Sequence, residues 1–198
     1  PADSDLFFGR EHAIESFLNT MRVQPLMIVV GPSGAGKSSF VQAGIIPGLP
    51  AGWRVITLRP EYAPLANLKA RLVKEGIEAP DLDVALKLNT NVLGEVLRTA
   101  AEISGKGLLL VVDQFEELFT LCQDPSQRQL YAQGLARAAR SAEDSIRIIL
   151  TLRDDFLVRA REMPGLGEQL TQGLELLTTP GEQDLLRILL EPARRAGY

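Results

Sequence analysis

The segment Gly31–Ser38 constrains the fold of this chain more than any other part of its sequence. It reads Gly-Pro-Ser-Gly-Ala-Gly-Lys-Ser and matches the pattern G-x-x-x-x-G-K-[ST] at every fixed position. Glycines permit backbone conformations in which successive N–H groups surround an anion. The lysine of this pattern reaches the β- and γ-phosphates of a nucleotide, and the final hydroxyl ligates Mg²⁺. The pattern has this meaning only between a buried strand and a helix.

The neighbouring residues meet that condition. Leu26–Val30 is an uninterrupted apolar run, typical of a strand that is buried on both faces. A helix is expected from Lys37 to about Ala43, and the three glycines and two prolines of residues 44–52 predict a loop after it. We therefore expect the loop and the first helical residues to bind the nucleotide: Gly31, Pro32, Ser33, Gly34, Ala35, Gly36, Lys37, Ser38 and Ser39.

Strand and helix patterns alternate along the rest of the chain. Strands are predicted at residues 54–58, 108–112, 146–150 and, more weakly, 174–177; helices are predicted at residues 10–21, 65–75, 92–103, 125–140 and 154–161. Such alternation is typical of βαβ units, in which parallel strands are joined by helices. The fold class predicted is α/β, a P-loop NTPase three-layer sandwich with a mostly parallel five-stranded sheet and helices on both faces.

A carboxylate follows the apolar run Leu108–Val112. In open α/β sheets ligands bind at the carboxyl ends of the strands, so Asp113 is expected to face the phosphates. It would hold Mg²⁺ together with Ser38, either directly or through water, because Mg²⁺ retains several water ligands. An acid at a strand end is often only a helix cap, and the intact phosphate loop upstream is what favours the metal site.

Two further carboxylates, Glu116 and Glu117, follow in the run Gln-Phe-Glu-Glu. Either could orient or deprotonate the water that attacks a phosphate. Adjacent side chains point in different directions, so at most one of them faces the γ-phosphate. The other would be an acid favoured by the dipole at a helix N-terminus. Our interpretation favours Glu117 and keeps Glu116 as the alternative.

The strand predicted at residues 146–150 also ends in polar residues. If this strand lies between the phosphate-loop strand and the strand that ends at Asp113, Thr151 and Arg153 emerge beside the γ-phosphate. Arg153 could then sense that phosphate. The alternative is a surface ion pair of Arg153 with Asp154 or Asp155.

Composition excludes several other classes of protein. The net charge is −4, which argues against a domain built mainly to hold a nucleic-acid backbone. The single cysteine, Cys122, cannot form an internal disulfide or a finger-type zinc site, and His12 is the only histidine, so no Ser-His-Asp triad is available. No apolar run approaches the length of a membrane span, and a cytoplasmic location is expected. A guanine-specific Asn-Lys-x-Asp motif and an ABC-type Leu-Ser-Gly-Gly-Gln signature are absent.

Four motifs in this order resemble the STAND class of signal-transduction NTPases, and most closely its novel STAND subgroup. They are Phe8–Glu11, Gly31–Ser39, Val112–Phe119 and Thr151–Phe156. The resemblance implies ATP (or ADP) as the nucleotide, with Mg²⁺, and a switch with slow hydrolysis. It implies that Phe8, Gly9 and Arg10 lie near the adenine. It also implies an additional-strand sheet, with the fourth strand inserted beside the first.

The resemblance also suggests how the chain is divided and what surrounds it. Residues 1–22 would complete the nucleotide site, residues 23–180 would form the NTPase core, and residues 181–198 would begin a truncated helical lid. The chain would be one domain of a larger signalling or defence protein, with WD-type repeats or an effector domain as partners in the same chain and with nucleotide-dependent self-association. The alternative is a nucleoside monophosphate-like small-molecule kinase, whose phosphate loop is similar.

Overall fold

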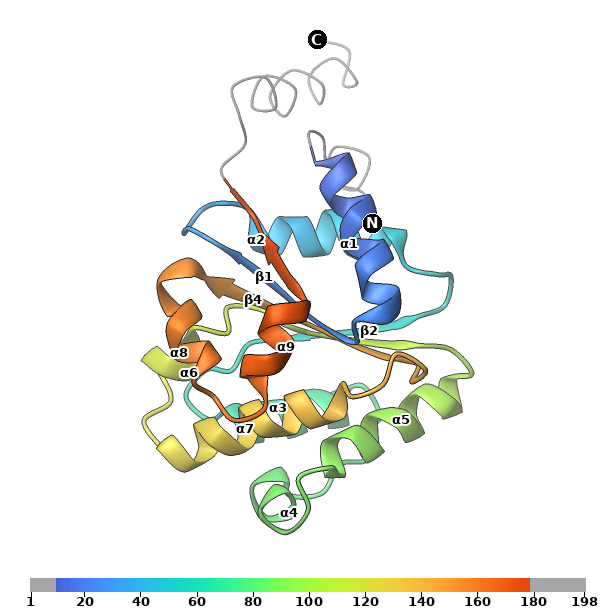
Figure 1. The fold of residues 1–198 in the computed structure, drawn as a ribbon. Helices are drawn as coiled ribbons and strands as arrows, with labels where there is room; N and C mark the ends of the chain where they lie inside the picture. The colour runs from blue at the N-terminus through green and yellow to red at the C-terminus, as the bar shows by residue number, and fades with distance from the viewer. Residues whose placement is uncertain (1–9, 179–198) are drawn as a thin grey trace.

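The computed structural model describes residues 10–178 and contains one five-stranded sheet (Figure 1). The strand order is β2-β3-β4-β1-β5, and every neighbouring pair is parallel. The strands are β1 (Leu26–Gly31), β2 (Arg54–Leu58), β3 (Leu108–Val112), β4 (Ile146–Arg153) and β5 (Leu174–Leu176). The predicted fold class is therefore confirmed, with a sheet that is parallel throughout.

The position of β4 determines which residues meet at the carboxyl edge of the sheet. This strand lies between β1 and β3, as the resemblance implied, with Gly31 opposite Arg153 and Val112 opposite Leu150. On the other side of β3, Leu58 of β2 lies opposite Val112. The residues that follow β1, β2, β3 and β4 are consequently neighbours at one edge.

Helices cover both faces of the sheet, and Figure 1 shows the two layers above and below it. The chain forms α1 (Glu11–Val23) and α2 (Lys37–Ser39) on one face. The other face carries α3 (Pro64–Lys74), α4 (Leu82–Leu88), α5 (Val92–Ser104), α7 (Pro125–Ala138) and α9 (Leu166–Gln172). Two shorter helices, α6 (Glu117–Thr120) and α8 (Leu157–Arg161), follow β3 and β4.

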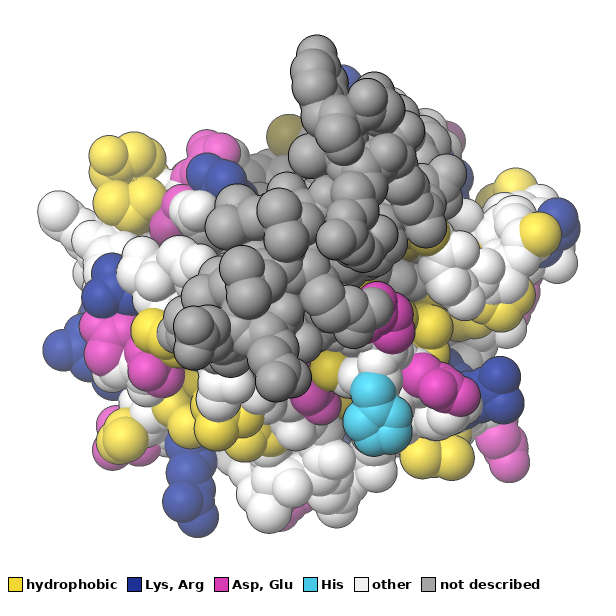
Figure 2. Space-filling view, turned by 90° about the horizontal axis from the view of Figure 1, so that it is seen from above, with side chains coloured by type: hydrophobic (Ala, Val, Ile, Leu, Met, Phe, Trp, Pro, Cys, Tyr) yellow, Lys and Arg dark blue, Asp and Glu magenta, His cyan; other side chains and the backbone are white. Residues whose placement is uncertain are grey.

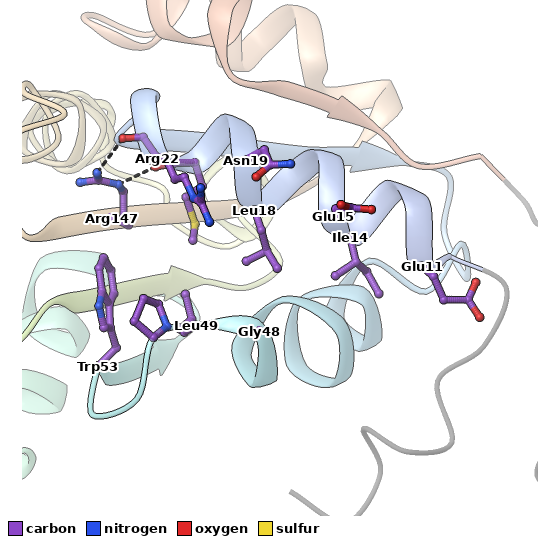
Figure 3. A pocket seen from close by; sticks show the side chains of 12 residues that line it. Glu11, Ile14, Glu15, Leu18, Asn19, Arg22, Gly48, Leu49, Trp53 and Arg147 are labelled. Carbon is purple, nitrogen blue, oxygen red and sulfur yellow. Dashed lines mark hydrogen bonds between the residues drawn. The ribbon is translucent and has the colours of Figure 1, made fainter.

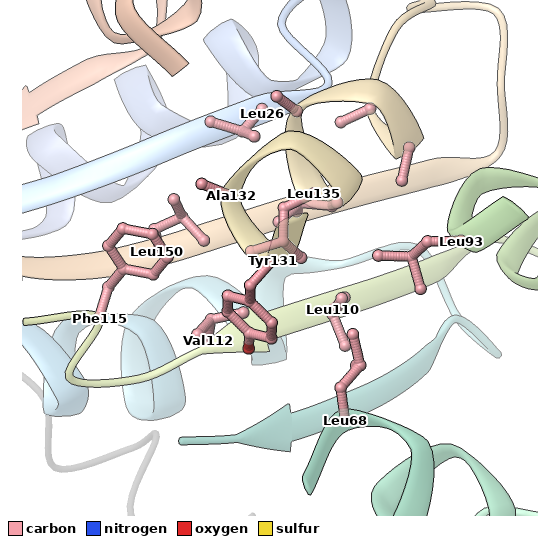
Figure 4. Close-up of a cluster of buried hydrophobic side chains, with 14 of the residues drawn as sticks. Leu26, Leu68, Leu93, Leu110, Val112, Phe115, Tyr131, Ala132, Leu135 and Leu150 are labelled. Atoms are coloured by element: carbon pink, nitrogen blue, oxygen red, sulfur yellow. The ribbon is translucent and has the colours of Figure 1, made fainter. Parts of the chain in front are cut away.

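Two hydrophobic cores result from the alternation of side chains along each strand. In β1, Met27 and Val29 pack with Phe17 of α1, whereas Leu26, Ile28 and Val30 belong to the larger core on the opposite face. Figure 4 shows this larger core, where Tyr131, Ala132 and Leu135 of α7 pack over β3 and β4. Burial on both faces explains why the strands are continuous apolar runs.

The segment after Lys37 differs from the prediction. The loop expected over residues 44–52 is wrong for its first part, because helical turns continue through a π-helical stretch, Phe40–Ile45, and a 3₁₀ turn, Ile46–Gly48. Val41 and Ile45 are completely buried in the core under α1. Their burial stabilises helical turns that the local glycines and proline disfavour. The short helices α4, α6 and α9 were also not predicted.

Arg147 fastens the C-terminal end of α1 to the start of β4, at the edge of the sheet opposite the phosphate loop. Its Nε donates to the Met21 carbonyl at 2.6 Å and its Nη2 to the Arg22 carbonyl at 3.0 Å (Figure 3). The remaining donors reach carbonyls of residues 142, 144 and 146. Burial lowers the pKa of Arg147, and this set of carbonyl acceptors compensates for the buried charge. A groove of about 500 Å³ beside Trp53 borders this junction.

The start of α7 gives a first test of the fold. Asp124 is the N-cap, and its Oδ1 accepts from the backbone N–H groups of Ser126 and Gln127. We expect Asp124→Ala to lower the free energy of unfolding by about 1 kcal/mol, because two helix donors lose their acceptor. The melting temperature should fall by roughly 2–4 °C. Glu15→Ala, at an exposed acid within α1 and away from both of its caps, is the control; equal melting temperatures for the two variants would contradict the capping role.

Candidate nucleotide-binding site

The phosphate loop connects β1 to α2 and has the backbone that the motif requires. Gly34 and Gly36 have φ angles of +79° and +84°, in the left-handed region that favours glycine. Gly31 has a different constraint, since a Cβ there would overlap the Leu177 carbonyl oxygen. The three glycines are therefore explained by backbone conformation and by the close approach of the segment after β5.

Lys37 lies across its own loop. Its Nζ donates to the carbonyl of Gly31 at 2.8 Å and to that of Pro32 at 2.9 Å. Both acceptors are neutral, and a hydrogen bond to a phosphate oxygen would be charge-assisted and stronger. The ammonium is thus placed at the mouth of the loop, with partners that it can exchange for an anion.

Asp113 is the centre of a hydrogen-bonded cluster at the carboxyl edge of the sheet. Its Oδ1 accepts from Ser38 Oγ and from Thr151 Oγ1, both at 2.7 Å, and the residue is only 7% exposed. Ser38 comes from the start of α2 and Thr151 from β4, so three separate elements meet here. Hydroxyl and carboxylate oxygens are the donor set that suits Mg²⁺. The residues present therefore fit the metal that the sequence predicted.

Thr151, which was predicted to emerge beside the γ-phosphate, lies next to Asp113 at the carboxyl edge of the sheet. The residue is buried, and its Oγ1 also accepts from the backbone N–H of Gln114 at 2.8 Å. Gln114, which sequence reasoning passed over, has a φ of +53°, uncommon for a residue with a side chain. Its position directly after the strand-end acid, Asp113, is the feature of the sequence that could have indicated a role for Gln114. Backbone strain of this kind is often found at functional sites.

The two adjacent glutamates lie on opposite sides of β3. Glu116 Oε2 accepts from the backbone N–H of Arg153, at the end of β4, at 3.4 Å. Glu117 Oε2 accepts from the backbone N–H of Glu61, in the loop after β2, at 3.1 Å. Because β4 separates β3 from β1, Glu116 is on the side of the phosphate loop, whereas Glu117 is on the far side.

The negative charge of Glu117 also acts on the buried Tyr131 side chain of α7. The Tyr131 hydroxyl is completely buried and has no hydrogen-bond partner within the described residues. Burial raises the pKa of Tyr131 far above its usual range, and the negative charge of Glu117 raises it further. Tyr131 therefore stays neutral, and Glu117 borders the hydrophobic core as well as the loop after β2.

Arg153 adopts the surface pairing that the sequence left as its alternative. Nε and Nη2 donate to the two carboxylate oxygens of Asp155, at 3.0 and 2.8 Å. The guanidinium also lies 5.6 Å from the centre of the Phe156 ring, and the side chain is 43% exposed. The backbone of Arg153 is next to Gly31, so its side chain would have to leave Asp155 to reach a nucleotide.

Arg10 is the one residue of the predicted adenine-end set that the structure describes; Phe8 and Gly9 lie outside the described residues. Its Nη2 donates to the carbonyl of Ala35 in the phosphate loop at 3.0 Å and to that of Thr178 at 2.9 Å. The start of α1 is thereby joined to the phosphate loop and to the segment after β5. Residues 181–198, expected to begin a lid, also lie outside the described part.

The match to a protein family decides the identity of the chain. The family model described as Novel STAND NTPase 1 matches residues 1–198. The chain belongs to this family. A search of curated proteins finds no match. This novel STAND NTPase is therefore a P-loop NTPase whose family implies nucleotide binding, in agreement with the intact phosphate loop.

Solved structures share the fold of this novel STAND NTPase. A Walker-type ATPase of Pyrococcus abyssi superposes with a TM-score of 0.61 at 16% identity, over 96% of this chain and 59% of the other. The Aeropyrum pernix ORC2 protein in its ADP form gives 0.58 at 18% identity, over 96% and 53%. Cdc6p from Pyrobaculum aerophilum gives 0.59 at 16% identity, over 94% and 49%. The chain thus spans about half to three fifths of these relatives.

The surface of the novel STAND NTPase carries charges of both signs. In the view of Figure 2, both Lys or Arg and Asp or Glu side chains occur around the described part of the face. The His12 side chain is exposed. Within residues 10–178, no helix is long and apolar enough to cross a membrane.

Proposed function

We propose that this chain is the ATP-binding, Mg²⁺-dependent switch domain of a larger signalling or defence protein, and that it hydrolyses ATP slowly. The observation that carries the proposal is the joining of Ser38, Asp113 and Thr151 at the end of an intact phosphate loop. Membership of the novel STAND NTPase family supports nucleotide binding. The slow rate, the switch role and the cytoplasmic location rest on the resemblance.

Each group of the loop has a separate role in this proposal. Backbone N–H groups of the phosphate loop from Ser33 onward surround the phosphates, and the Lys37 ammonium exchanges its two carbonyl partners for phosphate oxygens. Ser38 and Asp113 hold Mg²⁺, which when bound neutralises charge on the β- and γ-phosphates. Thr151 keeps the Asp113 carboxylate in place through its hydroxyl hydrogen bond.

Glu116 is the better candidate for the base that positions water. Its carboxylate lies at the end of β4, next to the strand that begins the phosphate loop, whereas Glu117 is held by the loop after β2. A general base must come within hydrogen-bond reach of the water that it deprotonates. The water would lose a proton to Glu116 as its oxygen attacks the γ-phosphorus and the bond to the β-phosphate oxygen breaks.

The sensor role of Arg153 requires a change of partner. In the ATP-bound form its guanidinium would leave Asp155 and turn toward the γ-phosphate. The ion pair that it would break is exposed and contributes little stability. The N-terminal segment of residues 1–22, with Phe8, Gly9 and Arg10, would contact the adenine end. Residues 181–198 would begin the lid over the core of residues 23–180. Partner domains in the same chain, such as WD-type repeats or an effector domain, would respond to the bound nucleotide. Self-association of the protein would respond to it as well.

Product analysis separates this function from a small-molecule kinase. With Mg²⁺-ATP alone, the chain should release inorganic phosphate and ADP in equal amounts, and nucleoside monophosphates should not change the rate. The measurement is phosphate release together with chromatography of the nucleotides. Formation of a second nucleoside diphosphate from an added monophosphate would instead show phosphoryl transfer to an acceptor and contradict the proposal.

A further inference from the structure

The loop of residues 59–63, between β2 and α3, contacts the acidic segment after β3 at two points. Arg59 Nε lies 3.6 Å from Asp113 Oδ2, and the backbone N–H of Glu61 donates to Glu117 Oε2 at 3.1 Å. Sequence reasoning gave this loop no role. The first of these contacts places a cation at the carboxylate that is proposed to hold the metal.

Neighbouring contacts fix the position of Arg59. The preceding residue, Leu58, accepts a hydrogen bond from the backbone N–H of Asp113 at 2.8 Å, so the two strand ends are in register. On the other side, Asn67 Nδ2 donates to the Pro60 carbonyl and to Glu61 Oε2, both at 3.1 Å. Arg59 therefore extends from an anchored backbone next to Asp113.

The two oxygens of Asp113 have different surroundings. Oδ1 already accepts two hydroxyl hydrogen bonds, from Ser38 and Thr151. Oδ2 faces Arg59, whose side chain is 50% exposed, while that of Asp113 is 11% exposed. The guanidinium thus neutralises the carboxylate at its solvent side. A dication that approaches this oxygen is repelled by the guanidinium and must displace it.

We propose that Arg59 competes with Mg²⁺ for Asp113 and thereby raises the Mg²⁺ concentration that nucleotide binding requires. The inference rests on the proposed function, because it concerns the same metal site. Arg59 is a positioning residue in this account: it holds Asp113 before the metal arrives and moves into solvent when the metal binds. Half of its side chain is already exposed, so this movement requires no rearrangement of the core.

The test is a Mg²⁺ titration with a fluorescent ATP analogue at constant ionic strength, and the same binding measured in EDTA. In R59Q the Mg²⁺ concentration for half-maximal binding should fall about two- to fivefold, the range expected for an exposed ion pair. In EDTA, R59Q and wild type should bind the nucleotide equally well. R59K should resemble wild type in the Mg²⁺ titration because it keeps the positive charge. R54Q is the matched control, since Arg54 begins the same strand at the opposite edge and lies near Glu75 instead.

Three results would overturn the inference while leaving nucleotide binding intact. An unchanged Mg²⁺ dependence in R59Q would mean that Arg59 does not compete. Weaker binding with and without Mg²⁺ would mean that Arg59 contacts the phosphates. An equal change in R54Q would indicate a general effect of charge. If wild type fails to bind nucleotide under every condition, the proposed function fails first and this inference with it.

Discussion

Replacing Lys37 with alanine should abolish the stabilisation of the chain by Mg²⁺-ATP. A ligand at 100 times its Kd stabilises the native state by about 2.7 kcal/mol, which for a domain of this size is roughly 5–10 °C in melting temperature. The Lys37 ammonium donates to the phosphate-loop carbonyls of Gly31 and Pro32. Its loss removes the charge that a polyphosphate meets at the loop mouth, and thermal unfolding with and without nucleotide measures the effect.

The control for this prediction is Lys74→Ala. Lys74 is exposed in the last turn of α3, away from the phosphate loop, and its replacement changes the net charge by the same amount. This variant should keep the full shift in melting temperature. Equal shifts in wild type and Lys37→Ala would show that the nucleotide binds elsewhere, and would contradict the site described for Ser38 and Asp113.

The sequence was sufficient to predict the sheet because its strands are buried on both faces. Runs such as Leu26–Val30 and Leu108–Val112 consist of apolar residues that no amphipathic helix would contain, and both predicted strands are present. The helical turns over residues 44–48 could not be predicted from local propensity. They are stabilised by tertiary burial of Ile45 against the core under α1, and glycine and proline at these positions disfavour helix locally.

Some residues of the site could also be predicted from the sequence, whereas others depend on the tertiary structure. A motif with fixed spacing identified Lys37 and Ser38, and a position directly after a buried apolar run identified Asp113. The hydrogen bond between Ser38 and Asp113 joins elements far apart in the sequence. The contribution of Arg59 was not predictable, because it depends on β2 being the neighbour of β3. Strand order is a property of the whole sheet, and no local pattern near Arg59 encodes it.

Strand order also bears on the choice between the two glutamates. The sequence-based interpretation favoured Glu117, although no local pattern distinguishes it from Glu116. In the structure the hydrogen bond from Arg153 holds Glu116 toward β4, and the hydrogen bond from Glu61 holds Glu117 toward β2. The phosphate loop begins at β1, on the β4 side. Our proposal therefore assigns the base to Glu116, and the choice can be tested directly.

Glu116→Gln should lower the rate of ATP hydrolysis about a hundredfold or more, because a general base typically contributes 10²- to 10⁴-fold. Nucleotide binding should change little, since the amide keeps the shape of the side chain and the Lys37 and Asp113 contacts are untouched. Glu117→Gln is the matched control: it is adjacent, chemically identical and on the far side of β3. Single-turnover phosphate release measures hydrolysis, and titration with a fluorescent nucleotide measures binding. A larger loss of hydrolysis in Glu117→Gln would reverse the assignment, because it would show that the catalytic water lies on the β2 side of Asp113.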